Sequence, residues 1–484
     1  MAPARALVAS NRGPITVTVD DEGEDRIDRG GGGLVSGMVA ALEEHAGAVW
    51  VCAALNDRER TLARQAGGES LAGVGVDTGD LDVRMLPIDA NTFRQAYTGI
   101  ANSTLWYIQH LLFDRAYRPA FDTPWRRQWD GYRRYNRQFA DALARAAEPG
   151  SPVMVQDYHL CLAPAQVRER RDDVRISHFT HTPWAPVDSY RMLPDDVARE
   201  VLEGLLGADL VGFHTRRWAD AFLACVDDTL GLEVGDGTVT TADGRTVRTG
   251  VFPLGVDAAA IHERAHRRDA ERALRQLREL VGDRAVITRV DRTELSKNIL
   301  RGLLAYREFL RRHPEWHDRV VHIAYADPSR LDLPDYRDYT SDVERVGAEI
   351  ADEFGTDTWD PVLVETGGDY PASLAAQRLA DVVFVNPVRD GMNLVVKEGA
   401  LLSEKDAVVV LSREAGAVPE LGEHALLVNP FDVSGTAETL HEALIMPAAE
   451  RSRRAAALRD ASAHGAPRAW FEDQLAAVAE APAG

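Results

Sequence analysis

At 484 residues the chain is too long for one ordinary hydrophobic core, so its length favours two domains. Its 55 basic and 76 acidic residues give a net charge of −21, which argues against nucleic acid and anionic membrane surfaces as partners. The three cysteines, Cys52, Cys161 and Cys225, lack metal-ligand spacing, and neither an apolar signal core nor an apolar run of membrane length is present. We therefore expect a cytoplasmic protein that binds small molecules.

Apolar segments of strand type alternate with helical segments along the chain, a pattern typical of doubly wound α/β domains. Pro253 and Gly255, followed by a charged helix, mark a domain boundary near residue 256. In the first half the pattern predicts strands at 6–9, 15–19, 48–53, 152–156, 176–180 and 210–213, helices at 34–44, 132–147 and 215–230, and a hairpin at 239–247. In the second half it predicts strands at 285–290, 319–324, 362–365, 382–385 and 407–411, and helices at 297–312, from 394, from 437 and at 470–478.

Two polar residues of the first half stand at the ends of successive predicted strands. Asp157 follows the strand at 152–156, and His181 follows the strand at 176–180. Open α/β sheets bind ligands beyond the carboxyl ends of their strands, so we expect both side chains at one edge of the sheet. The glycine run 30–33, ahead of a predicted helix, has two interpretations, a phosphate cradle or a flexible flap.

Two cations of the second half also lie at a strand end. Arg292 falls in the loop after the strand at 285–290, and Lys297 stands at the head of the next helix. An arginine binds phosphate through a bidentate fork and a lysine binds it as a point charge, so the pair can clamp a diphosphate. The alternative is a surface pair that flanks a helix, in a chain with 55 basic residues.

The stretch 381–404, DVVFVNPVRDGMNLVVKEGALLSE, combines a buried strand, a loop and a helix. The helix expected from Leu394 offers unpaired N–H groups and the positive end of its dipole to a phosphate. Gly391 lets the backbone approach a ligand closely. Asp390 can accept hydrogen bonds from sugar hydroxyls, and Glu398 can bind a ribose diol. The alternative is a solvated βα loop with an incidental acid.

The segment RDGMNLVVKE, residues 389–398, resembles the C-terminal signature of the trehalose-6-phosphate synthases. These are retaining glucosyltransferases of the two-domain GT-B type, in glycosyltransferase family 20, and the likeness is to actinobacterial members. The segments SNR, GGL, DYHL, HTPW, GFHT, RTELSK and LSREAGAVPEL resemble further parts of the family. The resemblance implies two Rossmann-like domains that face across a cleft. Residues 1–256 would bind the acceptor and residues 257–484 the nucleotide sugar, with the last helix, about 468–480, crossing back to the first domain.

The resemblance also implies roles for individual residues. By it, Tyr97 and Trp106, nine residues apart, line the acceptor-phosphate pocket, and the glycine run is a flap near the donor. The implied acceptor-binding residues are Arg12, Tyr97, Trp106, Asp157 and Arg330. The implied donor-binding residues are Gly32, Gly33, His181, Arg292, Lys297, Asp390, Gly391, Met392, Asn393, Leu394 and Glu398, of which His181, Arg292, Lys297 and Asp390 are implied to be catalytic.

The implied reaction moves glucose from GDP-glucose or UDP-glucose to glucose 6-phosphate, with retention at the anomeric carbon, and gives trehalose 6-phosphate. No DxD-type motif stands in a suitable place, so neither a metal nor a cofactor is expected. Thr293, Glu294, Leu295 and Asn298 replace the family's usual Leu, Asp, Tyr and Gly, which leaves the donor nucleotide open.

Three other functions fit the same scaffold: a pseudo-glycosyltransferase, a glucosylglycerol-phosphate synthase with a smaller acceptor, and a non-catalytic sugar-phosphate sensor. The intact loop 390–393 argues against the first and the last, and Tyr97 with Trp106 argues against the second. The oligomeric state is open, with a homodimer or a homotetramer as candidates.

Overall fold

The computed structural model describes residues 5–20, 22–29, 35, 38–39, 42, 47–114 and 116–480. Gly32, Gly33 and most of the predicted helix 34–44 lie outside the described residues. The chain divides into two compact units: unit 1 consists of residues 1–254 and 467–484, and unit 2 of residues 255–466. Within the described residues, no helix is both long and apolar enough to span a bilayer.

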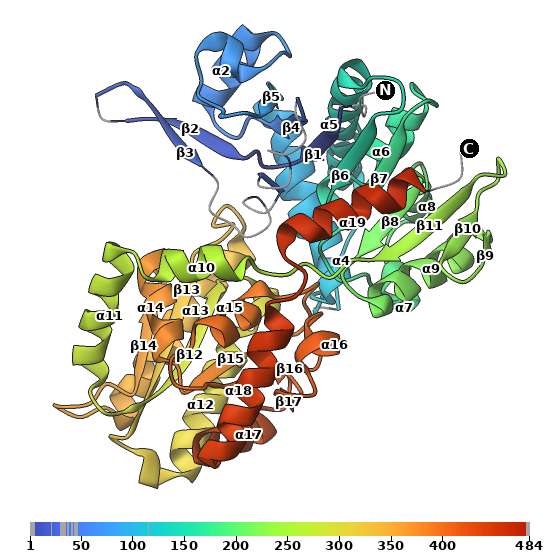
Figure 1. Cartoon of the computed structure of the whole chain (residues 1–484). Coiled ribbons are helices and arrows are strands. Elements are labelled where there is room, and N and C mark those ends of the chain that lie inside the picture. Colours follow the sequence, from blue (N-terminus) through green and yellow to red (C-terminus); the bar gives the residue numbers. More distant parts are fainter. Residues whose placement is uncertain are drawn as a thin grey trace. The chain divides into compact units, whose positions relative to one another are not determined.

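Unit 1 is built on a largely parallel sheet with the strand order β5-β4-β1-β6-β7-β8-β11-β10-β9 (Figure 1). β9 and β10 extend it as antiparallel strands, and β2 pairs with β3 in a separate hairpin. The central strands are apolar and fully buried, as expected for a parallel sheet covered on both faces. The strands of unit 1 are β1 Leu7–Ser10, β2 Ile15–Val19, β3 Asp25–Arg29, β4 Val49–Ala53, β5 Asp82–Leu86, β6 Pro152–Gln156, β7 Arg175–Thr180, β8 Leu210–Phe213, β9 Glu233–Val234, β10 Thr238–Thr240 and β11 Thr246–Val251.

The helices of unit 1 include the last helix of the chain, α19, which lies across β6, β7 and β8 (Figure 1). Trp470 of α19 is buried, and its Nε1 donates a hydrogen bond to the Phe252 carbonyl at 3.0 Å. The C-terminal residues therefore complete the core of unit 1. Its helices are α2 Asp57–Ala66, α3 Ala90–Phe93, a π-helix Arg94–Leu105, α4 Trp106–His110, α5 Thr123–Ala146, α6 Ala163–Arg168, α7 Val187–Tyr190, α8 Asp195–Leu205, α9 Arg216–Leu230 and α19 Pro467–Ala479, with 3₁₀-helices at Leu71–Val74 and Tyr158–Leu160.

Unit 2 contains a parallel sheet with the strand order β14-β13-β12-β15-β16-β17. Its strands are β12 Ala285–Arg292, β13 Val320–Asp327, β14 Val362–Glu365, β15 Val382–Val385, β16 Val408–Ser412 and β17 Leu426–Val428. Its helices are α10 Ala258–Ala265, α11 Arg268–Val281, α12 Ile299–Arg312, α13 Pro334–Phe354, α14 Tyr370–Leu379, α15 Leu394–Leu402, α16 Val418–Leu421, α17 Val433–Ile445 and α18 Ala448–Ser462, with 3₁₀-helices at Leu295–Lys297 and Pro314–Trp316.

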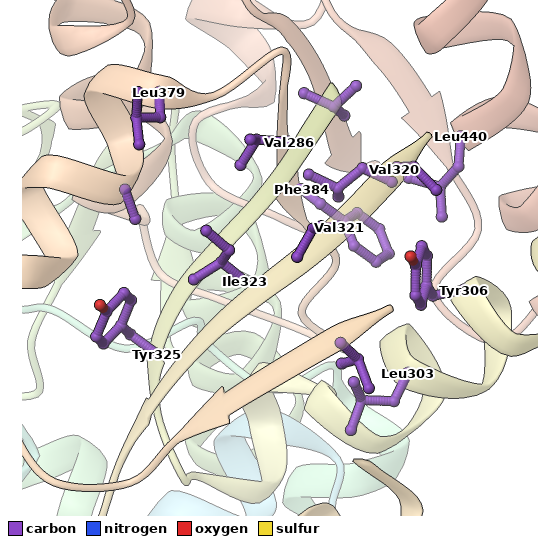
Figure 2. Packing of buried hydrophobic residues seen from close by; sticks show 14 of the residues in the cluster. Val286, Leu303, Tyr306, Val320, Val321, Ile323, Tyr325, Leu379, Phe384 and Leu440 are labelled. Atoms are coloured by element: carbon purple, nitrogen blue, oxygen red, sulfur yellow. The ribbon is translucent and has the colours of Figure 1, made fainter. Parts of the chain in front are cut away.

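The core of unit 2 lies on both faces of its sheet because successive strand side chains point to opposite faces. Phe384 of β15 packs in one cluster with Tyr306 of α12 and Leu440 of α17 (Figure 2). The next residue, Val385, belongs to a second cluster, which contains residues of α15 and α18. The short, continuously apolar strands of the sequence are therefore buried between two layers of helices.

Most predicted elements agree with the structure. The strands predicted at 15–19, 152–156, 210–213, 362–365 and 382–385 match β2, β6, β8, β14 and β15 residue for residue, and the helix predicted from Leu394 is α15. The helix predicted at 132–147 begins earlier, at Thr123. Asp122 caps that end by accepting a hydrogen bond from the Trp125 N–H at 2.9 Å, and Pro124 follows in the first turn.

The prediction around the two donor cations was wrong in its boundaries. β12 does not end at residue 290 but includes Arg292, because β13 is equally long and the two strands pair in register as far as Arg292 and Asp327. Lys297 does not begin the long helix either. It ends the 3₁₀-helix Leu295–Lys297, and α12 begins at Ile299.

Candidate active site

Each of the two large sheets contains six strands whose order reverses at one point. Counted in chain order, β12 to β17 are arranged 3-2-1-4-5-6, and β1, β4, β5, β6, β7 and β8 are arranged in the same way. Sheets of this kind bind ligands beyond the carboxyl ends of the strands at the reversal. The reversal lies between β1 and β6 in unit 1 and between β12 and β15 in unit 2. Arg12 and Asp157 follow the first pair of strands, and Lys297 and Asp390 follow the second.

An ion pair lies at the reversal of strand order in unit 2, which we call its switch point. Lys297 Nζ donates to Asp390 Oδ2 at 2.6 Å, and both side chains are 16% exposed. Burial alone would lower the pKa of Lys297, but the carboxylates of Asp390, Asp291 and Glu294 raise the pKa above its ordinary value. Lys297 is therefore a fixed positive charge at the place where the sequence predicts a diphosphate.

The loop between β15 and α15 is held in an unusual backbone conformation. Asn393 has φ 85°, and its side-chain oxygen caps α15 by accepting a hydrogen bond from the Val396 N–H at 3.1 Å. Its Nδ2 donates to Asp390 Oδ2 at 3.0 Å. Asn393 thus fixes both the start of the helix and the carboxylate predicted to hold sugar hydroxyls.

A second segment supports this loop through backbone hydrogen bonds. Gly416 N–H donates to the Asp390 carbonyl at 3.1 Å, and Ala417 N–H donates to the Met392 carbonyl at 2.9 Å. A Cβ on Gly416 would lie 2.5 Å from the carbonyl carbon of Gly391, so only glycine fits. The Met392 side chain packs in the apolar core, which leaves its backbone as the part able to reach a ligand.

Two charged residues of α15 have different environments. Lys397 is fully buried and forms an ion pair with Glu420, which connects α15 to α16. Glu398 lies at the next position, and burial raises its pKa to about 7, against the opposing effect of a hydrogen bond with Gln377. A carboxyl group with this pKa changes its charge close to neutral pH.

Asn298 explains one departure from the family's usual residues. It has φ 61° and ψ 34°, the left-handed conformation that glycine adopts most easily and asparagine tolerates. Its Nδ2 donates to the carbonyl oxygens of Asn386 at 2.9 Å and Pro430 at 2.8 Å. The asparagine therefore keeps the backbone turn after Lys297 and adds two buried hydrogen bonds.

A buried ion pair beneath this site was not foreseen from the sequence. Arg289 Nε lies 3.0 Å from Asp291 Oδ2, and both side chains are almost inaccessible. The Arg289 guanidinium also bonds the Asn386 side chain and the Lys297 carbonyl. Burial raises the pKa of Asp291 despite the attraction of Arg289 and Lys297. The available signal was the charge of Arg289 inside the strand predicted at 285–290, two positions before Asp291.

Arg330 and Arg292 share one buried carboxylate. Arg292 Nη2 lies 3.0 Å from Glu294 Oε1, and Arg330 Nη2 lies 3.7 Å from the same oxygen. Arg330 Nη1 also donates to the Tyr336 hydroxyl at 2.7 Å. The cation predicted for the donor and the one predicted for the acceptor therefore belong to one cluster. Glu294 is a member of it that no sequence pattern singled out.

In unit 1, Asp157 and His181 meet at the ends of adjacent strands. The His181 N–H donates to Asp157 Oδ1 at 3.2 Å, and His181 Nε2 lies 3.0 Å from Gln156 Oε1. Burial and the neighbouring His214 and His178 hold the pKa of His181 well below its ordinary value, so the imidazole is neutral. The expected meeting of these two residues at one edge is confirmed.

The π-helix Arg94–Leu105 places the side chains of Tyr97 and Trp106 on the same face of the helical segment. In an α-helix, at about 100° per residue, side chains nine positions apart lie on opposite faces. In the i→i+5 pattern, with about 4.4 residues per turn, nine positions make close to two full turns. Tyr97 stacks on His159 at 5.5 Å between ring centroids, and Trp106 lies 5.6 Å from the ring of Tyr158. Both aromatic residues therefore contact the segment directly after Asp157.

Several of the predicted site residues have a strained backbone conformation. Seven non-glycine residues among those described have positive φ: Leu111, Asp157, Asn298, Asp318, Arg330, Asn393 and Asp406. Three are predicted site residues, and Asn298 adjoins Lys297. Such conformations persist only where the surrounding structure enforces them, and they cluster at active sites. They favour function over the alternative of incidental surface loops.

One group of potential metal ligands occurs among the described residues, His313, Glu315 and His441, with ligand atoms within 4.8 Å of one another. The two imidazole rings stack with 3.8 Å between centroids and 5° between planes, so their lone pairs lie in two parallel planes and do not converge on one ion. His441 Nδ1 also accepts a hydrogen bond from Trp316 Nε1 at 3.2 Å. This geometry does not suit a metal.

The arrangement corresponds to a known family. The sequence profile of glycosyltransferase family 20 matches residues 4–480. The chain belongs to glycosyltransferase family 20. A trehalose-6-phosphate synthase of Mycobacterium avium is 35% identical over 98% of this family 20 chain and 95% of its own length. A bifunctional trehalose-6-phosphate synthase/phosphatase of Thermoproteus tenax is 36% identical over 94% of the chain, which spans 61% of that longer relative.

Solved structures agree with the family assignment. A structure from E. coli bound with UDP-2-fluoro glucose superposes with a TM-score of 0.84 at 28% identity, covering 98% of this chain and 99% of the other. An alpha,alpha-trehalose-phosphate synthase (UDP-forming) from Burkholderia xenovorans in complex with glucose-6-phosphate gives the same four values, a TM-score of 0.84, 28% identity, and coverage of 98% and 99%. The α/β GT-B fold and the resemblance noted in the sequence are confirmed.

Proposed function

We propose that this family 20 enzyme transfers glucose from a nucleoside-diphosphate glucose to glucose 6-phosphate, with retention, and releases trehalose 6-phosphate. The observation that carries the proposal is the Lys297–Asp390 pair at the switch point of unit 2, in a chain whose residues 4–480 match the family. UDP-glucose and GDP-glucose are the candidate donors. Relatives described as UDP-forming and the neighbour bound with UDP-2-fluoro glucose support the first of them.

The chemistry requires stabilisation of a leaving diphosphate. Arg292, Lys297 and the N–H groups at the start of α15 would bind its oxygens, and the positive charges would offset the negative charge that develops as the bond breaks. Asp390 and the neutral His181 would hold hydroxyls of the donor glucose. Glu398 would bind the ribose diol. In this proposal the cations come from the protein, and no metal takes part.

Retention without a covalent intermediate needs attack on the face that the diphosphate leaves. The acceptor hydroxyl oxygen would form a bond to the anomeric carbon while the bond from that carbon to the diphosphate oxygen breaks. The hydroxyl proton would pass to the departing phosphate oxygen. Arg12, Tyr97, Trp106, Asp157 and Arg330 would orient glucose 6-phosphate, which supplies the entropic part of the rate enhancement.

Replacement of Arg330 by alanine is expected to raise the KM for glucose 6-phosphate by about 10–100-fold, the range for losing a charge-assisted hydrogen bond. The KM for the donor should change little. Steady-state kinetics with each substrate varied in turn will test this. Arg345→Ala is the matched control, because Arg345 lies exposed on α13 and pairs with Asp342 and Glu349. Equal effects on both KM values would contradict the acceptor role.

The KM for the donor is expected to fall as the pH rises through about 7, because Glu398 ionises there and only its carboxylate can accept hydrogen bonds from both hydroxyls of a diol. Glu398→Gln should raise this KM and remove its pH dependence. Glucose 6-phosphate must be saturating throughout, since its own phosphate titrates at about pH 6. An unchanged pH profile in the variant would contradict the assignment.

The decisive experiment measures nucleoside-diphosphate release from UDP-, GDP- and ADP-glucose, with and without glucose 6-phosphate, and identifies the sugar product. Release that depends on the acceptor, with a non-reducing disaccharide phosphate as product, would support the synthase, and the fastest donor would identify the nucleotide. The same rate in EDTA is expected. Substrate binding without release would favour a pseudo-glycosyltransferase or a sensor.

A further inference from the structure

Glu294 is a buried carboxylate with an unusual set of partners. Its side chain is 0% exposed and lies just after β12. Its Oε1 atom lies 3.0 Å from Arg292 Nη2 and 3.7 Å from Arg330 Nη2, and the Ser329 hydroxyl donates to it at 3.4 Å. A buried carboxylate remains charged only when cations and donors compensate the loss of water. Here the two compensating cations are those proposed for two different substrates.

The two arginines are held to different degrees. The Arg330 side chain is 9% exposed and is fixed on its other side by Tyr336, whose ring also lies under the guanidinium. The Arg292 side chain is 60% exposed, and Glu294 holds its guanidinium in place at the end of β12. Glu294 also contributes to the raised pKa of Lys297. One carboxylate therefore offsets repulsion among three cations that must stay close together.

We propose that Glu294 is a positioning residue that serves both substrates, holding Arg292 toward the donor diphosphate and Arg330 toward the acceptor phosphate. An arginine has five N–H donors, so each guanidinium can keep its ion pair with Glu294 and still present other N–H groups to a phosphate. Pre-orientation by Glu294 lowers the entropy lost when each phosphate binds. This inference rests on the proposed function, and it goes beyond it by joining the two substrate sites through one residue.

The test is Glu294→Gln, which keeps the shape of the side chain and removes its charge. We expect the KM for the donor and the KM for glucose 6-phosphate each to rise about tenfold, because both arginines lose their ion-pair partner. Arg330→Ala, by contrast, should affect the acceptor alone. Glu294→Asp restores the charge and should bring both KM values back toward those of the wild type. A fall in either KM would mean that Glu294 competes with phosphate, and the proposal would be wrong.

A matched control exists in the same unit. Glu353 is also shared by two arginines, Arg307 and Arg311, but lies on the helical surface between α12 and α13. Glu353→Gln makes the same chemical change and should leave both KM values unaltered. If it raises them as much as Glu294→Gln does, the effect comes from general loosening of the unit, and the positioning role is excluded.

A double-mutant cycle separates positioning from a merely structural effect. In an Arg330→Ala background, Glu294→Gln should no longer raise the KM for glucose 6-phosphate, but should still raise the KM for the donor. Additive effects on the acceptor would overturn the proposal. A wild-type enzyme without turnover would contradict the proposed function instead. In that case calorimetry with UDP and with glucose 6-phosphate tests Glu294 by affinity, and a wild type that binds neither would overturn both.

Discussion

Replacement of Lys297 by alanine is expected to lower kcat/KM for the nucleoside-diphosphate glucose by about 10²–10³-fold, the loss seen when one preorganised charge-stabilising group is removed. Lys297 lies at the sheet reversal of unit 2 and pairs with Asp390 at 2.6 Å. Its removal takes away a diphosphate ligand and also leaves the Asp390 carboxylate without that cation. Both effects should be larger in the transition state, where the leaving group gains charge, so kcat should fall as well as the donor affinity.

Lys405→Ala is a suitable control for this substitution. Lys405 also pairs with an aspartate of unit 2, Asp381, at 2.9 Å, but it is 38% exposed and has no place in the proposed site. Initial rates of diphosphate release at varied donor concentration will compare the two variants, with thermal denaturation to exclude unfolding. Retention of more than about one tenth of the wild-type kcat/KM by Lys297→Ala would contradict the assigned role.

The second large effect is expected from Gly416→Ala, although Gly416 is not a proposed ligand of either substrate. The new Cβ would lie 2.5 Å from the carbonyl carbon of Gly391. No rotamer change can relieve this clash, because the backbone sets the position of a Cβ. The loop 390–393 must move, and displacement of binding groups by about 1 Å can cost 10²-fold in rate. We therefore expect donor kcat/KM to fall by about that factor, with overpacking costing about 1–3 kcal/mol of stability.

Gly73→Ala provides the comparison for this variant. Gly73 lies in the 3₁₀-helix Leu71–Val74, and a Cβ at that position would meet no atom within 4 Å. Donor affinity measured by calorimetry, together with the melting temperature, will distinguish a displaced loop from an unfolded unit. Wild-type donor affinity in Gly416→Ala would show that the segment 414–417 does not position the loop.

The sequence predicted the parts of the fold that depend on local pattern. The apolar run at 382–385 and the break before Leu394 located β15 and α15 correctly, because a buried parallel strand and a helix start each have strong local signals. The meeting of Asp157 and His181 followed from the geometry of parallel strands. The family resemblance added Arg330, Tyr97 and Trp106, which no local pattern would have chosen.

The parts that could not be predicted depend on contacts between distant segments. β12 continues to Arg292 because β13 pairs with it in register, and nothing in the sequence of β12 alone shows where its partner ends. The close approach of Gly416 to Gly391 requires two loops to be in place. Glu294 is a conspicuous charge only once its burial and its two arginines are known. Hydrophobic periodicity carries no information on such pairings.

The π-helix Arg94–Leu105 has a consequence for how this segment can change over evolution. The common orientation of Tyr97 and Trp106 depends on how many residues separate them, since the wide turn converts that count into an angle. Loss of one residue would let the segment wind as an ordinary α-helix and turn Trp106 away from Tyr158. Substitutions between the two aromatic residues are therefore less disruptive than insertions or deletions. In this stretch the orientation of Trp106 depends more on the number of residues than on their identities.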